Sequence, residues 1–187
     1  MKKWLIVLIT IGVVLVIFAG WFISGWNKVI VLDQKVSEGW AQVENQLQRR
    51  IDLIPNLVRT VKGYASHEKE LFTRVTELRS QWAKAQTRGE KIKAAEGLGG
   101  ALSRLLLVAE SYPDLKASQN FLTLQAQLEG TENRIAVERN RYNRDVRAYN
   151  IYVKNIPGVI FASLRGKKPA EFFEAEAAAK AVPKVEF

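Results

Sequence analysis

Residues 4–27 read WLIVLITIGVVLVIFAGWFISGWN, a stretch without a single charged side chain. An α-helix rises about 1.5 Å per residue, so ~20 apolar residues cross the ~30 Å hydrocarbon core of a bilayer. Indole rings settle among lipid headgroups, and tryptophans lie near both ends of the stretch: Trp4, Trp21 and Trp26. The stretch therefore predicts a transmembrane helix that follows a short basic N-terminus, residues 1–3.

A cleaved signal peptide also begins with lysines and an apolar run. Its apolar core is shorter, however, and small residues precede its cleavage site. Here Ala19 and Gly20 are followed by bulky Trp21 and Phe22. A lipoprotein anchor needs a cysteine, and the chain has none. We interpret the stretch as a retained anchor.

Composition limits the chemistry of the remaining residues, 28–187. Without cysteine there is no disulfide framework and no thiolate metal site, and the one histidine, His67, cannot form a histidine cluster. We therefore expect no metal and no cofactor. The chain carries a formal charge of +9, and a basic domain tethered to a membrane meets anionic headgroups more readily than nucleic acid.

Apolar residues spaced four and three apart predict one helix that leaves the membrane and continues without a breaker through Trp40. This stripe comprises Val36, Trp40, Val43, Leu47, Ile54, Leu57 and Val61. Pro55 lies inside the pattern and cannot donate a hydrogen bond to the carbonyl of Ile51, so we expect a kink or local break near residues 52–56. Gly63 is the expected stop.

Three further helices are expected: one from about Ser66 to Thr87, one from about Glu90 or Leu98 to Tyr112, and the longest from Pro113. In the longest helix a coiled-coil-like interval of seven joins Phe121, Leu128, Ile135, Tyr142 and Tyr149. The helix should stop before Pro157-Gly158.

Short connections between long helices with these patterns favour an all-α fold, in which the N-terminal transmembrane helix precedes a long antiparallel four-helix bundle over residues 28–157. Residues 158–187 are expected to form a partly helical tail, with a short helix in Ala-rich residues 170–181.

The charged residue in the stripe of the first bundle helix is Arg50. On the longest helix the matching row turns polar, and Glu132 and Glu138 lie there. We predict that Arg50 meets one of these carboxylates inside the bundle and fixes its register. Such a pair contributes more to specificity than to net stability.

Other motifs offer weaker chemistry. HEKEL, residues 67–71, lacks the second histidine of a zinc peptidase, so a solvated first turn of a helix explains it better. EGLGGA, residues 96–101, lacks the G-K-[ST] of a phosphate loop, and helix–helix spacing or a kink explains it better. Arginines interleave with tyrosines over residues 134–152, but Tyr142 and Tyr149 fall on the apolar stripe, which favours core positions over base stacking.

Three long runs resemble the LemA family of bacterial membrane proteins: WAQVENQLQRRIDLIPNLVRTVKGYASHE (40–68), ALSRLLLVAESYPDLKASQNF (101–121) and LEGTENRIAVERNRYN (128–143). The resemblance covers residues 28–157 and the anchor, and the tail is less similar. It implies a single N-terminal transmembrane helix, a four-helix bundle and no catalytic residues. One family member is linked to magnetosome membrane formation, and others occur beside membrane-bound peptidases.

These observations favour a non-enzymatic single-pass protein of the bacterial envelope that self-associates into a homo-oligomer through its bundle and organises or remodels membrane. The alternative is an adaptor or modulator of another membrane protein, such as a membrane-bound protease. The lipid bilayer is the expected partner, and nucleic acid is not.

The orientation in the inner (cytoplasmic) membrane is weakly specified. Lys2 and Lys3 precede the anchor, and Lys28 and Lys35 follow it, so the positive-inside comparison ties. A short basic N-terminus before a long domain favours a bundle in the periplasm or outside the cell.

Overall fold

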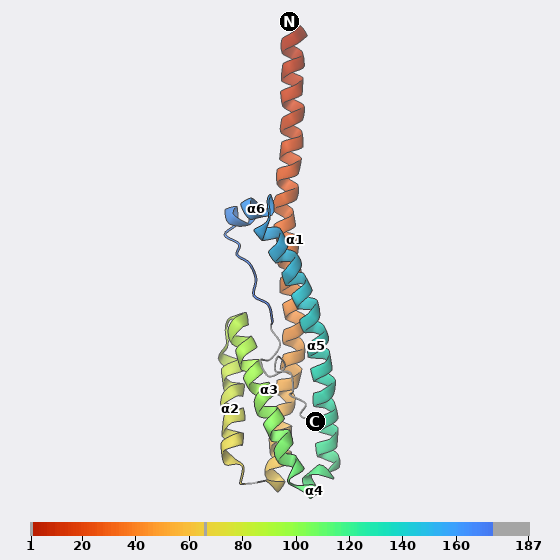
Figure 1. Cartoon of the computed structure of the whole chain (residues 1–187), viewed down its shortest axis with the longest axis vertical. Helices are drawn as coiled ribbons and strands as arrows, with labels where there is room; N and C mark the ends of the chain where they lie inside the picture. The colour runs from red at the N-terminus through yellow and green to blue at the C-terminus, as the bar shows by residue number, and fades with distance from the viewer. Residues whose placement is uncertain (1, 66, 174–187) are drawn as a thin grey trace, which may run out of the picture. The chain divides into compact units, whose positions relative to one another are not determined.

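The computed structural model describes residues 2–65 and 67–173, which are mostly helical and contain no strand. In chain order the helices are α1 (Lys2–Tyr64), α2 (Lys69–Lys84), α3 (Arg88–Glu110), α4 (Pro113–Lys116), α5 (Gln119–Lys154) and α6 (Gly158–Leu164) (Figure 1). They form two compact units. The first unit comprises Met1–Trp40 and Arg141–Phe172, and the second comprises Ala41–Asn140 and Phe173–Phe187.

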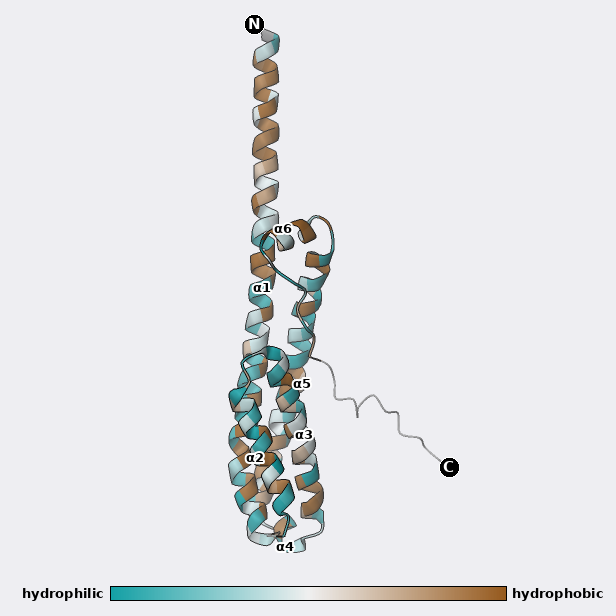
Figure 2. Ribbon diagram, turned by 90° about the vertical axis from the view of Figure 1, so that its left-hand side faces the viewer, coloured by the Kyte–Doolittle hydropathy of each residue, from teal (hydrophilic) through white to brown (hydrophobic). Residues whose placement is uncertain are grey.

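Helix α1 starts with the apolar stretch (Figure 2), and residues 4–23 are exposed throughout. Its most apolar part is long enough to cross a membrane. The helix continues through residues 28–40 without interruption, as the absence of a breaker predicts. Pro55 lies inside α1, which continues as a helix through residues 52–56 without a break; a kink at Pro55 stays a prediction.

In the first unit, α1 packs against the C-terminal part of α5. Gly39 allows close approach there, because a β-carbon at this position would lie 3.3 Å from the Cα of Tyr142. The rings of Trp40 and Tyr142 meet edge to face, with centroids 5.7 Å apart. The core of this unit consists of Val29, Val36, Trp40, Tyr142, Val146, Tyr149, Val153, Phe161 and Ala162.

In the second unit, the apolar stripes read from the sequence are buried. On α1 they comprise Val43, Leu47, Ile54, Leu57 and Val61; on α2, Leu71, Val75, Leu78 and Trp82; on α3, Leu98, Leu102, Leu105 and Ala109; and on α5, Phe121, Leu128 and Ile135. Gly97 of α3 lies against Leu78 of α2, where a β-carbon would approach Leu78 Cδ2 to 2.8 Å. EGLGGA is thus helical and spaces two helices, as predicted.

Polar contacts join α1 to its neighbours in the second unit. Trp82 Nε1 of α2 donates a hydrogen bond to Gln48 Oε1, at 3.1 Å. Lys91 of α3 forms an ion pair with Glu44. These contacts place α2 and α3 beside the part of α1 that follows Trp40.

Two helix starts differ from the sequence prediction. Helix α3 begins at Arg88 rather than near Glu90 or Leu98, because Thr87 and Glu90 form a capping box in which each side chain accepts from the other's backbone N–H. Helix α2 begins at Lys69, and Ser66, its expected start, lies outside the described residues.

The region after Pro113 also differs from the sequence prediction. The prediction of one longest helix from Pro113 is wrong: the proline opens the single turn α4, and α5 begins at Gln119, while α1 is longer than α5. In the tail, α6 forms at Gly158–Leu164 instead of a helix that starts at residue 170. The remainder of the Ala-rich segment, from residue 174, lies outside the described residues.

Candidate membrane-interface site

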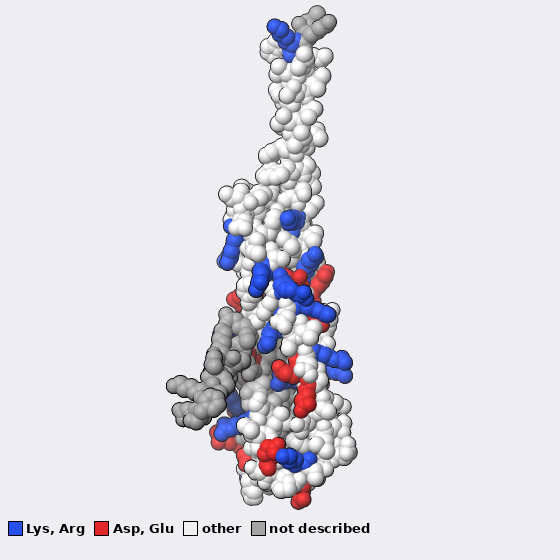
Figure 3. All heavy atoms as spheres, turned by 45° about the vertical axis from the view of Figure 1, so that its right-hand side comes forward, with Lys and Arg blue, Asp and Glu red and all other residues white. Residues whose placement is uncertain are grey.

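The site lies in the first unit, at the C-terminal end of the apolar stretch of α1. About 20 residues counted from Trp4 bring the helix to the far edge of a hydrocarbon core, near residue 24. Aromatic rings cluster at this level: Phe18 lies beside Trp21, at 5.7 Å between centroids, and Phe22 stacks on Trp26 at 6.0 Å. Figure 3 shows that the helix carries no charge between its N-terminal end and this level.

Helix α6 packs on this aromatic cluster through Phe161, whose side chain is 1% exposed. Its ring centroid lies 5.4 Å from that of Trp21 and 5.3 Å from that of Phe22. Gly25 makes room for it, since a β-carbon there would overlap the Phe161 ring. Tyr152 at the end of α5 completes the contact by donating its hydroxyl to the Gly25 carbonyl, at 3.1 Å.

Cationic groups surround the same level. Lys28 Nζ lies 4.8 Å from the centroid of the Tyr152 ring, and Arg165 Cζ lies 4.6 Å from that of the Trp26 ring. Both cations face aromatic π systems, an attraction worth about 0.5–1 kcal/mol at exposed sites. Lys167 Nζ pairs with Asp33 Oδ2 at 2.7 Å and ties the chain after α6 back to α1.

Residues 165–172, which we call the strap, follow α6 and are held on α5. Asn150 exchanges two hydrogen bonds with Ala170: its Nδ2 donates to the Ala170 carbonyl at 2.9 Å, and its Oδ1 accepts from the Ala170 N–H at 2.8 Å. The hydroxyls of Tyr149 and Tyr142 donate to the carbonyls of Lys168 and Glu171, at 3.0 and 2.8 Å. The strap thus fixes α6 from its C-terminal side.

The tyrosines at this site stay protonated donors at neutral pH. Burial raises the pKa of Tyr149, and the negative charge of Asp33 raises it further. Burial also raises the pKa of Tyr152. Because Tyr142 and Tyr149 are 1% and 2% exposed, they occupy core positions, and their rings are not open for stacking on bases.

The predicted anchor tryptophans divide between two places. Trp21 and Trp26 belong to this site, whereas Trp4, which is 79% exposed, lies at the other end of the apolar stretch. Sequence reasoning missed Phe161, Tyr152 and Arg165. The signal for the last part of the site was present as an apolar run followed by cations, VIFASLRGKK, residues 159–168.

The predicted register pair lies in the second unit. Arg50 Nη1 is 2.7 Å from Glu132 Oε2, so the structure brings these two residues together. The side chain of Glu132 is 52% exposed, and that of Arg50 is 17% exposed. Arg50 is thus largely buried and Glu132 half exposed, and a role of the pair in fixing the register stays a prediction. Glu138 is a half-buried residue further along α5; a role in register stays a prediction.

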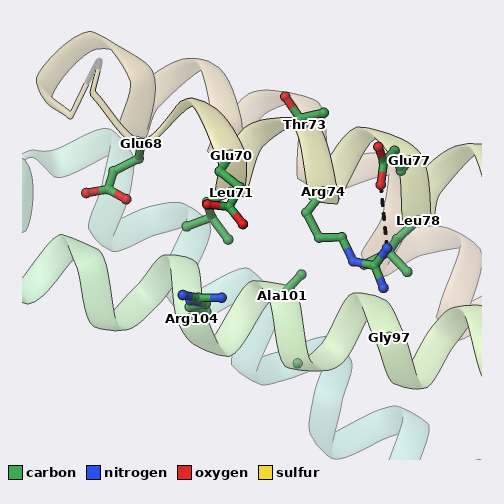
Figure 4. Close-up of a pocket in the computed structure, with 11 residues that line it drawn as sticks. Glu68, Glu70, Leu71, Thr73, Arg74, Glu77, Leu78, Gly97, Ala101 and Arg104 are labelled. Atoms are coloured by element: carbon green, nitrogen blue, oxygen red, sulfur yellow. Dashed lines mark hydrogen bonds and ion pairs between the residues drawn. The ribbon is translucent and has the colours of Figure 1, made fainter.

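The groove between α2 and α3 gathers charged side chains. Glu70, Arg74 and Glu77 line it from α2, and Arg104 lines it from α3 (Figure 4). Arg74 and Glu77 form an ion pair at 3.5 Å, and both side chains are more than half exposed. Among the described residues no group of three potential metal ligands occurs. Solvated surface charges are the simplest account of this groove.

Comparison with known proteins places the chain in one family. Residues 39–187 match the LemA family, so the match includes the tail. The magnetosome protein MamQ 2 of Paramagnetospirillum magneticum is 26% identical over 85% of this chain and 68% of its own length. MamQ of Magnetospirillum gryphiswaldense is 24% identical over the same shares. Protein LemA of Metamycoplasma hominis is 23% identical over 76% of this chain and 64% of its own. The chain belongs to the LemA family.

Proposed function

We propose that this chain is a non-enzymatic single-pass protein of the bacterial envelope that self-associates through its helical region and organises or remodels membrane. One observation carries the proposal: α1 passes from an exposed apolar stretch into a packed unit without a break. Contacts with α5, α6 and the strap hold α1 immediately after the stretch. The packing of that unit can therefore set the angle of the helix in the bilayer, which a flexible tether could not do.

The proposal includes an antiparallel four-helix bundle formed by the long helical segments of the second unit. Its support is the burial of one stripe on each segment and the polar contacts of α1 with α2, α3 and α5. Short connections, such as residues 85–87 between α2 and α3, favour antiparallel neighbours. Self-association would use the outer faces of such a bundle.

The absence of catalysis is also part of the proposal. Its support is that the charged residues of the groove between α2 and α3 are solvated and that the tyrosines of the interface site are hydrogen-bond donors within the fold. Three relatives are named as magnetosome proteins. We extend to this chain only an association with membrane, and not a role in any particular organelle.

We further propose the inner membrane as the location, with the helical region in the periplasm or outside the cell. A reporter fused at Phe187 that is active only in an oxidising compartment tests this orientation. The control is the same reporter at the N-terminus, before residue 4. Activity of the C-terminal fusion alone supports the proposal, and activity of the N-terminal fusion alone reverses the orientation.

Self-association is tested by co-expression of two full-length copies that carry different tags. After mild solubilisation, purification through one tag should recover the other copy. Copies expressed separately and mixed only after solubilisation provide the control for association in detergent. Crosslinking in native membranes separates the two functions considered: self-crosslinks support the proposal, whereas a stoichiometric foreign protein without self-crosslinks favours the adaptor alternative.

A further inference from the structure

Helix α6 is apolar on both of its faces. Its inner face carries Phe161 and Ala162, which are 1% and 2% exposed. Its outer face, together with the residue before Pro157, carries large apolar side chains that are 39–83% exposed: Ile156, Val159, Ile160 and Leu164. Within α6, Ile160 and Leu164 are four residues apart and form one stripe. A short helix with water on its outer side normally carries polar residues there.

The position of α6 explains this composition. Phe161 contacts Trp21 and Phe22, which lie at the edge of the span of α1. At this level α6 runs across α1 rather than along it (Figures 1 and 2). A helix that lies in the membrane plane buries its apolar face about 5–10 Å into the boundary between headgroups and acyl chains. The outer stripe of α6 is therefore beside lipid if α1 spans the bilayer.

The charges around α6 match a membrane surface. Residues 150–170 contain four Lys or Arg and no Asp or Glu. Lys154 and Lys168 are exposed, and Arg165 lies over Trp26 at the end of the span. Cations within a Debye length of a bilayer are attracted to anionic headgroups by about 1 kcal/mol each. An apolar stripe flanked by exposed cations suits the surface of a bilayer that contains anionic lipid.

We propose that α6 is an interfacial membrane helix: its outer stripe enters the leaflet next to the C-terminal end of the α1 span, and Lys154 and Lys168 contact anionic headgroups. This inference rests on the proposed placement of α1 in the membrane. It adds a second attachment in one leaflet, which gives the protein a means to sense or change the packing of that leaflet.

Spin labels at single cysteines test the insertion, because the natural chain has no cysteine and each label is unique. The full-length protein is placed in vesicles that contain phosphatidylglycerol, with the label at Ile160, Leu164, Ile9 or Val137. Collision with oxygen is compared with collision with a water-soluble nickel chelate. Ile9 is the reference within the span, and Val137, which is 49% exposed on α5, is the matched apolar position in the second unit.

Labels at Ile160 and Leu164 should favour oxygen, as the label at Ile9 does, whereas the label at Val137 should favour the nickel chelate. If Ile160 and Leu164 resemble Val137 while Ile9 favours oxygen, the inference is overturned and the span stands. If Ile9 itself favours the nickel chelate, the membrane placement of α1 fails first. The two failures are therefore distinguishable.

A second measurement tests the headgroup contact. Spin-labelled phosphatidylglycerol should associate with the full-length protein more strongly than spin-labelled phosphatidylcholine. The Lys154→Gln/Lys168→Gln variant should lose this selectivity by up to roughly fivefold per lysine. The matched variant Lys84→Gln/Lys93→Gln, which removes two exposed cations of α2 and α3, should retain it. Equal loss in both variants, or no selectivity in the natural protein, overturns the headgroup contact.

Discussion

The hydrogen bonds between Asn150 and the strap offer a quantitative test of how α6 is held in place. Asn150 is 7% exposed and makes two hydrogen bonds with Ala170. Each contributes about 0.5–1.5 kcal/mol net, so Asn150→Ala should weaken the strap by about 1–3 kcal/mol. The better helix propensity of alanine offsets up to about 0.7 kcal/mol of this loss. Asn140→Ala, at an exposed position of the same helix, measures this propensity gain alone.

Amide hydrogen exchange at Ala170 in the full-length protein measures the effect directly. Since 1.4 kcal/mol corresponds to a factor of ten, Asn150→Ala should reduce the protection of this amide by about tenfold, and Asn140→Ala should leave it unchanged. Unchanged protection in Asn150→Ala would refute the reasoning, because the hydrogen bond from Tyr149 to Lys168 would then suffice to hold the strap.

Asn150→Asp adds a dependence on pH with a defined sign. At pH 7 the carboxylate still accepts from the Ala170 N–H, but it faces the Ala170 carbonyl without a proton to donate. Protection at Ala170 should therefore be lower than in the natural protein at pH 7. As the pH falls through the pKa of the new acid, the protonated form regains a donor, and the protection should rise again. A protection that falls with decreasing pH would contradict this account.

Three further predictions concern the second unit. Hydrogen bonds from the backbone N–H groups of Thr87 and Gln86, and from the Thr87 hydroxyl, hold the pKa of Glu90 below its ordinary value. The Glu90 carboxylate therefore stabilises the fold above that ordinary pKa, and this stabilisation is lost as the pH falls through the lower pKa of the folded state. Glu90→Gln should reduce the acid sensitivity of thermal unfolding in that range. Gly97→Val should lower the melting temperature, because its side chain would displace Leu78, whereas Gly100→Val, with open space around it, should not. A double-mutant cycle of Arg50→Met and Glu132→Gln in urea unfolding should give a coupling below about 1 kcal/mol, because Glu132 is half exposed.

The long helices of this protein were predictable because burial and period agree along them. The seven-residue row of α5 is an example: Phe121, Leu128 and Ile135 are buried in one unit, and Tyr142 and Tyr149 in the other. These apolar side chains lie on one face of α5, and polar side chains lie on the other face. Such a pattern reports burial without information on the partner helix.

The ends of helices were predicted less well, for identifiable reasons. Thr87 and Glu90 form a capping box, which the spacing T-x-x-E indicates, although Gly89 between them is a poor helix former. Pro113 and Asp114 resemble the start of a long helix, and no glycine or proline marks the interruption after Lys116. The turn between α4 and α5 is therefore not encoded by a breaker residue.

The sequence did not predict helix α6, because this helix lacks the pattern of one apolar face and one polar face that is typical of a surface helix. Its inner and outer faces both carry large apolar side chains, and Ser163 is its one polar residue, so the helix shows no broad polar face and no long period. Phe161 could be assigned to a core only once Gly25, far away in the sequence, was known to lie beside it. The interface site combines α1, α5 and α6, and local patterns cannot reveal such a combination.

The number of chains per particle tests the central claim most directly. The full-length protein should be extracted from its membrane into nanodiscs with native lipid, and the particles should be weighed by mass photometry at several dilutions. We expect nanodiscs that hold several copies of the protein and that keep them on dilution. Lipid should remain around the apolar stretch in these particles. Discs with one copy at every protein density would contradict self-association, and a protein recovered without lipid would contradict the membrane span.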